Sequence, residues 1–307
     1  MELNWLEDVL ALAEHRNFSR AAEARHVTQP AFSRRIRAFE HWVGTPLFTR
    51  GTQGVAPTAA GTQLLERAGA LVAEVQAMRR AAVKAAGREG TSLTIAATHA
   101  LSFTFFPGWI RARVPMEALG TLNLVSDTMA ACERILLAGD ADLLLCHAGA
   151  GVPSGLPPAS FDSLVVGADR LVPVSAPDPA GAPRWALPGR PAAPLRLLAY
   201  SGASGLGRIL AARMLEARML DVPSRLALDP VFTSPLAATL LTMARQGHGL
   251  AWLPRTMAAE DLAAGRLMEA GDERHAIDVE IRLFRPRRPA SRAAEAFWQA
   301  IRAMPAG

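Results

Sequence analysis

The first 45 residues carry apolar side chains at intervals of three and four, which predicts three short helices. We expect the first helix to begin at Asn4, with Glu7 completing a capping box that satisfies free backbone N–H groups. Ser19 can cap the second helix and Thr28 the third, and Gly44 is expected to end the third. The inward face of the third helix is predicted to consist of Ile36, Phe39 and Val43.

A hairpin and a long helix are predicted next. Residues 46–58 fit two short strands joined by a turn at residues 51–54, and Thr58 can then cap a helix that runs to about residue 86. The apolar residues of that helix are spaced by four and three in alternation: Leu64, Ala68, Leu71, Val75, Met78 and Ala82. Because this is the spacing of a coiled coil, we interpret the helix as a dimerisation arm. Packing against its own domain is the alternative.

Beyond a glycine-rich linker at residues 87–90, the pattern changes to short apolar runs that alternate with helical periodicity. Strands are predicted at residues 93–97, 122–125, 142–146, 162–166, 171–174, 195–200, 225–228, 250–253 and 279–284. Helices are predicted from residue 98 through 113 and at residues 130–138, 205–217, 235–246, 256–264 and 290–304. Loops are predicted at residues 149–158 and 176–194. This alternation indicates an α/β fold built from βαβ units.

Length and composition narrow the class of protein. A chain of 307 residues suggests two domains, and half of the residues are apolar, which is enough for two cores. The start of the chain has early acids and no basic segment before an apolar run, so we expect no signal peptide. No stretch approaches the ~20 apolar residues of a membrane span. We therefore expect a cytoplasmic protein that does not enter a membrane.

Few residues suggest covalent or metal chemistry. The two cysteines, Cys132 and Cys146, lack metal-ligand spacing, so we interpret them as inert core thiols, with a redox switch as the alternative. The glycine-rich segment 202–207 is not a P-loop, because no Gly-Lys-Ser/Thr follows it, and Leu206 takes the place of a glycine that a nucleophile elbow needs. We predict that the protein is not an enzyme and has no catalytic residue, metal or cofactor.

Positive charge is concentrated around the third predicted helix. Residues 16–50 contain seven arginines and two glutamates, a net charge of +5 that equals the formal net charge of the whole chain. Short polar groups and arginines at the start of a helix are what a protein needs to reach into the major groove of DNA. Double-stranded DNA is therefore the expected partner, and a solvated charged helix face is the alternative.

The residues that carry a family pattern are Phe18-Ser19, Ala21-Ala22, Thr28-Gln29-Pro30-Ala31, Ser33, Ile36, Glu40, Gly44, Leu47-Phe48, Arg50, Thr58 and Gly61. In order and spacing they resemble the DNA-binding domain of LysR-type transcriptional regulators. The resemblance implies an N-terminal all-α winged helix-turn-helix, a long linker helix and a C-terminal α/β two-lobed effector domain resembling periplasmic binding proteins. It also implies a homodimer or homotetramer, with RNA polymerase as a partner if the protein is an activator.

Within the family, four segments resemble the hypochlorite-responsive branch: residues 98–102, 146–147, 198–201 and 249–254. The resemblance implies oxidant sensing through methionine and a response to oxidative stress. Leu206 and Leu236, however, stand where oxidisable methionines would align, so a small anionic metabolite and an oxidant both stay open as the signal. Arg25 is a second departure, because the family has leucine there; either it reaches a phosphate or the local core is repacked.

We expect two groups of DNA contacts. The exposed side of the third helix should read base edges, since Gln pairs with adenine and Arg with guanine. The residues assigned to this reading are Gln29, Pro30, Ser33 and Arg34. Arg35, Arg37 and Arg50 are assigned to backbone phosphates, which add affinity without reading sequence. Ser19, Arg20 and Thr28 complete the predicted DNA-binding set.

The effector is expected between two lobes, where strands end and helices begin, because free N–H groups there favour anions. The predicted residues are Thr98, His99, Ser102, Ser126, Asp127, His147, Ser201, Ser204, Phe232, Thr233 and Ser234. Ordinary helix capping is the alternative for the hydroxyl groups, and a structural role is the alternative for the two histidines.

The sequence thus predicts a DNA-binding domain at residues 1–58, a linker and dimerisation helix at 59–87, and an effector-binding domain at 91–307. Lobe I of the effector domain is expected at about 91–163 and 269–307, and lobe II at about 164–268. We expect the signal to shift lobe closure and hence the spacing of the DNA-binding heads. A solute-binding protein and an enzymatic α/β protein with a DNA-binding appendage are the alternatives.

Overall fold

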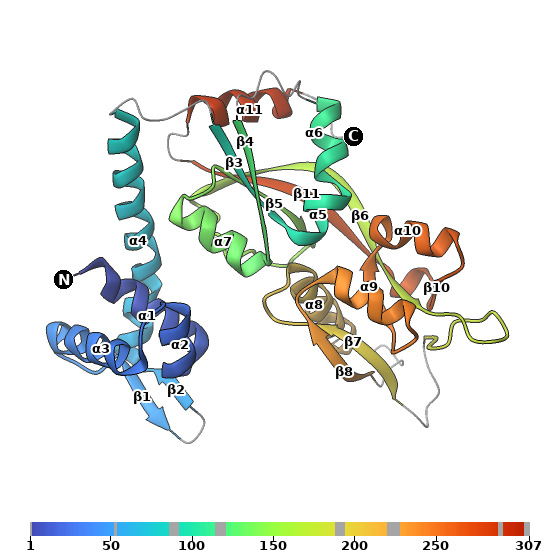
Figure 1. The fold of residues 1–307 in the computed structure, drawn as a ribbon, viewed down its shortest axis with the longest axis horizontal. Helices are drawn as coiled ribbons and strands as arrows, with labels where there is room; N and C mark the ends of the chain where they lie inside the picture. Colours follow the sequence, from blue (N-terminus) through green and yellow to red (C-terminus); the bar gives the residue numbers. More distant parts are fainter. Residues whose placement is uncertain are drawn as a thin grey trace. The chain divides into compact units, whose positions relative to one another are not determined.

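The computed structural model describes residues 2–51, 54–85, 92–113, 121–187, 194–219, 228–287 and 291–303 (Figure 1). Residues up to Glu89 form most of one compact unit and residues from Gly90 most of a second. Within the described ranges, no helix is long and apolar enough to cross a membrane.

The first unit begins with three helices, as predicted: α1 (Leu3–His15), α2 (Phe18–Ala24) and α3 (Gln29–Val43). The expected helix starts were partly wrong. Glu2 stands at the start of α1 and there is no capping box with Asn4. The Asn17 side chain, not that of Ser19, caps α2 by accepting the N–H groups of residues 19 and 20. Asn is a preferred capping residue, and here it stands two positions ahead of the serine that could compete.

The start and end of α3 follow the prediction more closely. Thr28 occupies the N-cap position, although its side chain makes no capping hydrogen bond. Gly44 ends the helix with φ of +86°, a conformation that glycine adopts without strain. Ile36 and Phe39 are fully buried, as expected, and Val43 is partly buried. These side chains pack with α1 and α2 into one apolar core.

A wing and a long helix complete this unit. The predicted hairpin is confirmed as antiparallel strands β1 (Phe48–Gly51) and β2 (Gly54–Pro57). Helix α4 (Ala59–Ala85) follows, and the Thr58 hydroxyl accepts the Gly61 N–H at 3.0 Å, which confirms the predicted cap. Gly61 packs closely on the hairpin: a Cβ there would lie 2.0 Å from the Leu47 carbonyl oxygen.

The apolar seam of α4 changes character along the helix. Ala68 is buried against the helical core, whereas Leu71, Val75 and Met78 are 51%, 38% and 57% exposed. Apolar side chains exposed in a row at four-and-three spacing are typical of a helix that pairs with another helix.

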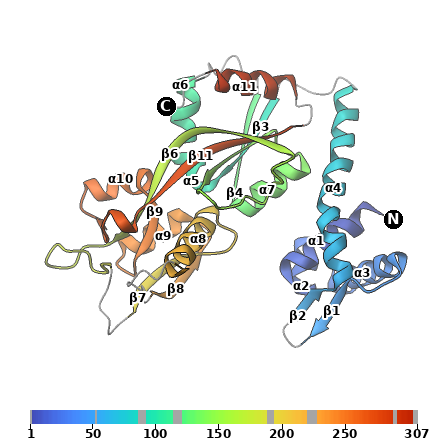
Figure 2. The ribbon, with the colours of Figure 1, turned by 180° about the vertical axis from the view of Figure 1, so that it is seen from behind.

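The second unit contains a seven-stranded mixed sheet, seen from two sides in Figures 1 and 2. One part of it holds the parallel strands β4 (Thr121–Asp127), β3 (Ser92–Thr98) and β5 (Leu143–Ala148), in that order. Helices α5 (His99–Thr104), α6 (Phe106–Arg113), α7 (Met129–Ala138) and α11 (Arg292–Arg302) accompany these strands. Apolar residues of β3, β5, α5, α6 and α11 form most of the core of lobe I.

Two long strands, β6 (Phe161–Ser175) and β11 (Ile277–Pro286), pair antiparallel and carry the sheet into lobe II (Figure 1). There β6 also pairs with β9 (Ala251–Pro254) and β10 (Met268–Glu269). Parallel strands β7 (Leu195–Tyr200) and β8 (Leu228–Ser234) lie in the same lobe, with α8 (Gly205–Met219), α9 (Ala237–Arg245), α10 (Arg255–Ala263) and a short 3-10 turn η2 (Glu273–His275). A second apolar core fills this lobe.

Most predicted strands and helices of this unit are confirmed to within a few residues, and three predictions needed correction. The strands expected at 162–166 and 171–174 are one continuous strand, β6, with Gly167 inside it. The helix expected up to Arg113 is divided at Phe105 into α5 and α6, ahead of Pro107, which fits the first turn of a helix. The strand expected to end at residue 228 runs on from Leu228 to Ser234 as β8.

A few expectations concern residues outside the described ranges. The linker at residues 87–90 and residues 225–227 belong to this group, as do residues 188–193 of the second predicted loop. Two short elements, β10 and η2, have no counterpart in the prediction, because two or three residues carry too little periodicity to be recognised.

Candidate nucleic-acid interface and effector pocket

The exposed face of α3 is narrower than the sequence predicted. Pro30, Arg34 and Arg37 are exposed and follow an i, i+4, i+7 spacing, so they share one side of the helix. Gln29 is exposed at the first turn. Ser33 is 7% exposed, so the prediction that its side chain is exposed was wrong. Its place, three residues after an exposed proline and one before an exposed arginine, is on the edge of the buried stripe.

The other expected DNA contacts lie at the start of α2, at the start of α3 and in the wing. Ser19, Arg20 and Thr28 are exposed. The backbone N–H groups of Ser19 and Arg20 are both taken by Asn17, at 2.9 and 3.1 Å, so their side chains are the groups that stay available to a ligand. Arg50 lies on β1 opposite Val55, and the described part of it is its backbone.

Arg35 points away from the exposed face and into an ion-pair cluster. Its Nε and Nη2 lie 2.7 and 2.9 Å from the two carboxylate oxygens of Asp8, a fully buried residue of α1. Arg25 also reaches Asp8, with its Nε 3.0 Å from Oδ1, and its Nη2 donates to Glu7. We name these four residues, Glu7, Asp8, Arg25 and Arg35, the Asp8 cluster. Its geometry shows how Arg25 is accommodated: the core is repacked around ion pairs.

In the second unit, a small pocket lies where the two lobes meet. Its wall combines the ends of β3, β4 and β5 with the first residues of α5, α7, α8 and α9. The lining residues are Thr98, His99, Ala100, Asp127, Thr128, Met129, His147, Ser204, Gly205, Leu206, Pro235 and Ala237. The cavity volume is about 30 Å³, which is room for one or two water-sized groups.

Five of the eleven predicted effector residues line this pocket: Thr98, His99, Asp127, His147 and Ser204. Ser102 and Ser126 stand beside it, since His99 Nδ1 lies 3.1 Å from Ser126 Oγ and the two serine hydroxyls are 2.8 Å apart. The remaining four are not part of its lining: Ser201, Phe232, Thr233 and Ser234. The last three belong to β8, which ends later than predicted, and Ser201 accepts the N–H of Ser204 through its backbone carbonyl.

Two polar atoms in the pocket wall are buried and make no hydrogen bond within the protein, the Thr98 hydroxyl and His147 Nε2. A buried polar group without a partner costs about 1–3 kcal/mol, so the Thr98 hydroxyl favours a ligand that can hydrogen-bond. Met129, which the sequence did not single out, is 4% exposed and lines the same pocket. Its position at the first turn of α7, two residues after the predicted Asp127, is the signal that could have found it.

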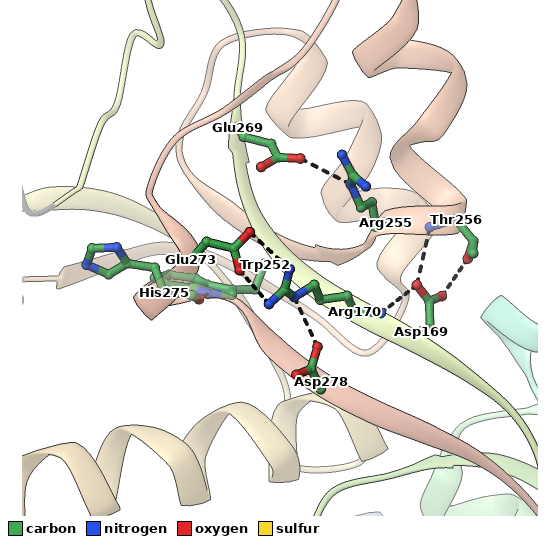
Figure 3. Close-up of polar contacts among 9 residues, drawn as sticks. All are labelled: Asp169, Arg170, Trp252, Arg255, Thr256, Glu269, Glu273, His275 and Asp278. Atoms are coloured by element: carbon green, nitrogen blue, oxygen red, sulfur yellow. Dashed lines mark hydrogen bonds and ion pairs between the residues drawn. The ribbon is translucent and has the colours of Figure 1, made fainter.

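Behind the pocket, His147 faces Asp169 of the crossing strand β6, with 3.9 Å between Nε2 and Oδ2. The Thr256 hydroxyl, at the start of α10, donates to the same carboxylate, as Figure 3 shows. Burial raises the pKa of Asp169, but the His147 imidazole, the Thr256 hydroxyl and the Arg170 backbone N–H together lower it below its usual value. The pocket wall is thus connected to lobe II through an ionised carboxylate.

The residue after Asp169 is Arg170, and its guanidinium lies between two acidic side chains (Figure 3). It is 2.7 Å from Glu273 of η2 and 3.0 Å from Asp278 of β11. Arg255 similarly meets Glu269 at 3.2 Å. Both acids of Arg170 are more than 80% exposed, so each pair contributes little to stability. The contacts of Arg170 join β6, η2 and β11, and none of these three residues lines the pocket.

A more buried ion pair joins the lobes directly. Both oxygens of Glu133, on α7, lie 2.9 Å from Arg208 Nη1, on α8, and Oε1 also accepts the Gly155 N–H at 2.7 Å. The Glu133 side chain is 7% exposed and that of Arg208 29%. The segment containing Gly155 connects β5 to β6, so one carboxylate ties a helix of each lobe to the chain that passes between them.

Neither cysteine has the features of a reactive thiol. Burial raises the pKa of the Cys132 thiol to about 12, and burial also raises the pKa of Cys146 strongly. Across the described part of the chain, no three His, Cys, Asp or Glu side chains gather in a way that could hold a metal ion.

Comparison with known proteins agrees with this architecture. Residues 3–62 match the bacterial regulatory helix-turn-helix protein, lysR family, and residues 86–306 match the LysR substrate binding domain. The transcriptional regulator YjiE of Escherichia coli is 29% identical over 302 residues, which cover 98% of this chain and 94% of YjiE.

Two solved full-length regulators are similar over almost the whole chain. DarR of Vibrio fischeri in complex with DNA is 29% identical with a TM-score of 0.56 and 99% coverage of both chains. HypT of Salmonella typhimurium, a hypochlorite-specific LysR-type regulator, is 30% identical with a TM-score of 0.57, covering 99% of this chain and 98% of HypT. Its regulatory domain with bound bromide is 25% identical with a TM-score of 0.56, covering 69% of this chain and 94% of that domain.

This chain therefore has the domain architecture of these regulators: a helix-turn-helix with a wing, a long helix and a two-lobed α/β unit. The chain belongs to the LysR family of bacterial transcription regulators, with an N-terminal DNA-binding domain and a C-terminal effector-binding domain.

Proposed function

We propose that this regulator responds to a small inorganic species, a halide-sized anion or an oxidant, held in the pocket between the lobes. The observation that carries the proposal is the buried Thr98 Oγ1, which has no hydrogen-bond partner, beside the His147 imidazole in a cavity of about 30 Å³. A cavity of that size has no room for a metabolite of several carbon atoms in this conformation. The bromide bound to the regulatory domain of HypT supports the anion.

The same pocket supports an oxidant as the second form of the signal. Met129 brings a thioether to the pocket wall, although Leu206 stands beside it in place of an oxidisable side chain. Oxygen transfer from hypochlorous acid to the sulfur would give the sulfoxide and release chloride and a proton, turning an apolar group polar between α7 and α8. The resemblance to the hypochlorite-specific regulator HypT supports this form of the proposal.

For DNA recognition, we propose that Gln29, Pro30 and Arg34 read base edges while Arg37 and Arg50 hold phosphates. Ser19, Arg20 and Thr28 are proposed as further backbone contacts. The exposure of the α3 face supports this assignment, and so does the DNA complex of the similar regulator DarR. Ser33 and Arg35 are removed from the set, since the first is buried and the second is paired with Asp8.

We propose residues 1–58 as the DNA-binding domain, residues 59–87 as the linker helix and residues 91–307 as the effector domain. The exposed apolar seam of α4 supports pairing of two copies. In this scheme, occupation of the pocket changes lobe closure and so the separation of the paired DNA-binding heads, a population shift that requires unequal ligand affinity for two states. RNA polymerase is the further partner where the protein activates transcription.

Ligand binding by the full-length protein tests the proposal. Sodium bromide should raise the melting temperature of the wild type more than sodium sulfate at equal ionic strength, and Thr98→Val should remove the difference. Thr233→Val, an exposed position on β8 outside the pocket, is the matched control and should keep it. For the oxidant form, mild hypochlorite should modify Met129 first, as read by mass spectrometry, and change operator binding. The proposal would be ruled out if bromide gave no specific rise in melting temperature and hypochlorite did not modify Met129 first.

A further inference from the structure

We infer that Asp8 is a positioning residue for DNA recognition: it sets the orientation of α3 and withholds Arg35 from the DNA backbone. The inference rests on the proposal that the exposed face of α3 enters the groove. Asp8 has none of its own surface exposed and lies on α1, a helix that has no residue in the proposed DNA-contact set.

The contacts of Asp8 fix α3 from behind. Arg35 Nη2 donates a hydrogen bond to Asp8 Oδ1 at 2.9 Å, and Arg35 Nε lies 2.7 Å from Asp8 Oδ2 as an ion pair. Such a pair resists rotation of the helix about its axis, because turning α3 would break both contacts together. Arg34 and Arg37, on the opposite side of the same turns, are thereby held outward.

Arg25 extends the constraint to the turn between α2 and α3. It follows α2 directly and binds Asp8 and Glu7 of α1, and the next residue, His26, has φ of +54°. This left-handed conformation is uncommon for residues other than glycine, and histidine is among the side chains that adopt it more readily. The ion pairs of the Asp8 cluster therefore connect α1, the end of α2 and α3. An apolar contact at this place would be less directional and would fix the helices less firmly.

The charge balance of the cluster bears on DNA affinity. Its two arginines face two carboxylates, so the net charge of the cluster is zero and the charge of Arg35 is already balanced by Asp8. Removing one arginine that neutralises a phosphate lowers the slope of log K against log salt by about 0.9 in magnitude. Arg37, exposed two residues further along α3, should count in that slope, whereas Arg35 should not.

The test compares Arg35→Gln with its matched control Arg37→Gln in the full-length protein. Affinity is measured by fluorescence anisotropy between 50 and about 300 mM salt, on an operator selected by the protein from a random duplex library and on a scrambled duplex. We expect Arg37→Gln to lower the slope by about 0.9 on both duplexes. Arg35→Gln should keep the slope and reduce the ratio of operator to scrambled affinity at least tenfold.

Asp8→Asn provides a second, independent readout, because the isosteric amide removes the charge that holds Arg35. Freed Arg35 should steepen the slope by about 0.9 and strengthen binding to the scrambled duplex while the operator preference falls. Circular dichroism establishes whether this variant folds; if it does not, the comparison of Arg35→Gln with Arg37→Gln decides alone. An equal decrease in slope for those two variants would overturn the role of Asp8. An unchanged slope in Arg37→Gln would instead contradict the proposed groove-facing side of α3.

Discussion

Replacing Arg208 by methionine isolates the contribution of the ion pair that joins the two lobes. The change removes the guanidinium that lies 2.9 Å from both oxygens of Glu133 and keeps much of the aliphatic stem. Glu133, 7% exposed, then keeps the Gly155 N–H as its hydrogen-bond donor among the residues that the structure describes. Breaking a buried pair from one side costs about 3–5 kcal/mol, because a charge stays buried and uncompensated.

Because Arg208 is 29% exposed, solvent reaches one side of the pair, and the lower end of that range applies, about 3 kcal/mol. For a domain of roughly 200 residues, each kcal/mol shifts the melting temperature by about 2–4 °C. Arg208→Met should therefore lower the melting temperature of the effector domain by about 6–12 °C.

Glu133→Gln is the informative partner variant. The amide has the same shape, its oxygen can still accept the Gly155 N–H, and the released Arg208 can turn towards water. Its cost should be that of one charged hydrogen bond, about 1.5 kcal/mol or 3–6 °C. Calorimetry of the full-length protein measures both, with Arg111→Met, an exposed arginine of α6, as the control. Glu133 is more buried than Arg208, so leaving the carboxylate without its partner should cost more than leaving the guanidinium without its partner. A destabilisation by Arg208→Met no larger than that by Glu133→Gln would refute the reasoning.

Three further predictions concern other parts of the molecule. The pKa of Asp169 is lower in the folded protein than its ordinary value of 3.8, so its contribution to stability is complete above pH 3.8 and is lost as pH falls through the folded pKa. In denaturant titrations, the difference in stability between the wild type and Asp169→Asn should therefore shrink as pH drops below 3.8. A difference that grows there would contradict the lowered pKa. Cys132 and Cys146 should resist a thiol reagent at pH 8 in the folded protein and react fully in denaturant, because burial raises both pKa values; stoichiometric labelling of the folded protein would disprove this. Val75→Glu should weaken self-association at least tenfold in sedimentation velocity, with Glu74→Gln as the control on the same turn, and an unchanged dimer would show that the α4 seam does not pair.

The sequence predicted the DNA-binding unit well because its signals are local. Gly44 ends α3 by its conformation, and the four-and-three spacing marks α4. The helix starts were harder, since Asn17 and Ser19 compete for the same free N–H groups and the geometry of the turn decides between them. Ser33 was misplaced because it sits at the border between the buried and exposed sides of α3.

The Asp8 cluster was missed for a different reason. Asp8 falls four residues before the buried Leu12, on the inward side of α1, where an acid is unusual. Arg25 is also unusual, because it is a positively charged residue where the family pattern has leucine. The two departures complement each other, and pairing them would have predicted the contact, but neither residue alone indicates the other. Arg35 could not be separated from Arg34 and Arg37 by residue type alone.

The effector pocket was predicted in part. Residues at strand ends, such as Thr98, Asp127 and His147, were found because the carboxyl ends of parallel strands share one edge of a sheet. Gly205 and Pro235 enter from the other lobe, and no local pattern states how the lobes meet. The continuous strand β6 was missed because Gly167 interrupts its apolar run; a Cβ there would lie 2.9 Å from the Phe105 ring, so the glycine serves close packing and not a turn.

The central claim is that the exposed face of α3 reads DNA sequence, and operator preference measures it most directly. Affinities of the wild type and Arg34→Ala are determined on the selected operator and on a scrambled duplex at the same salt concentration. A guanine contact is worth about 1–3 kcal/mol, so the account predicts a decrease in affinity of about 5- to 150-fold on the operator and a much smaller decrease on the scrambled duplex. Equal decreases on the two duplexes would contradict it.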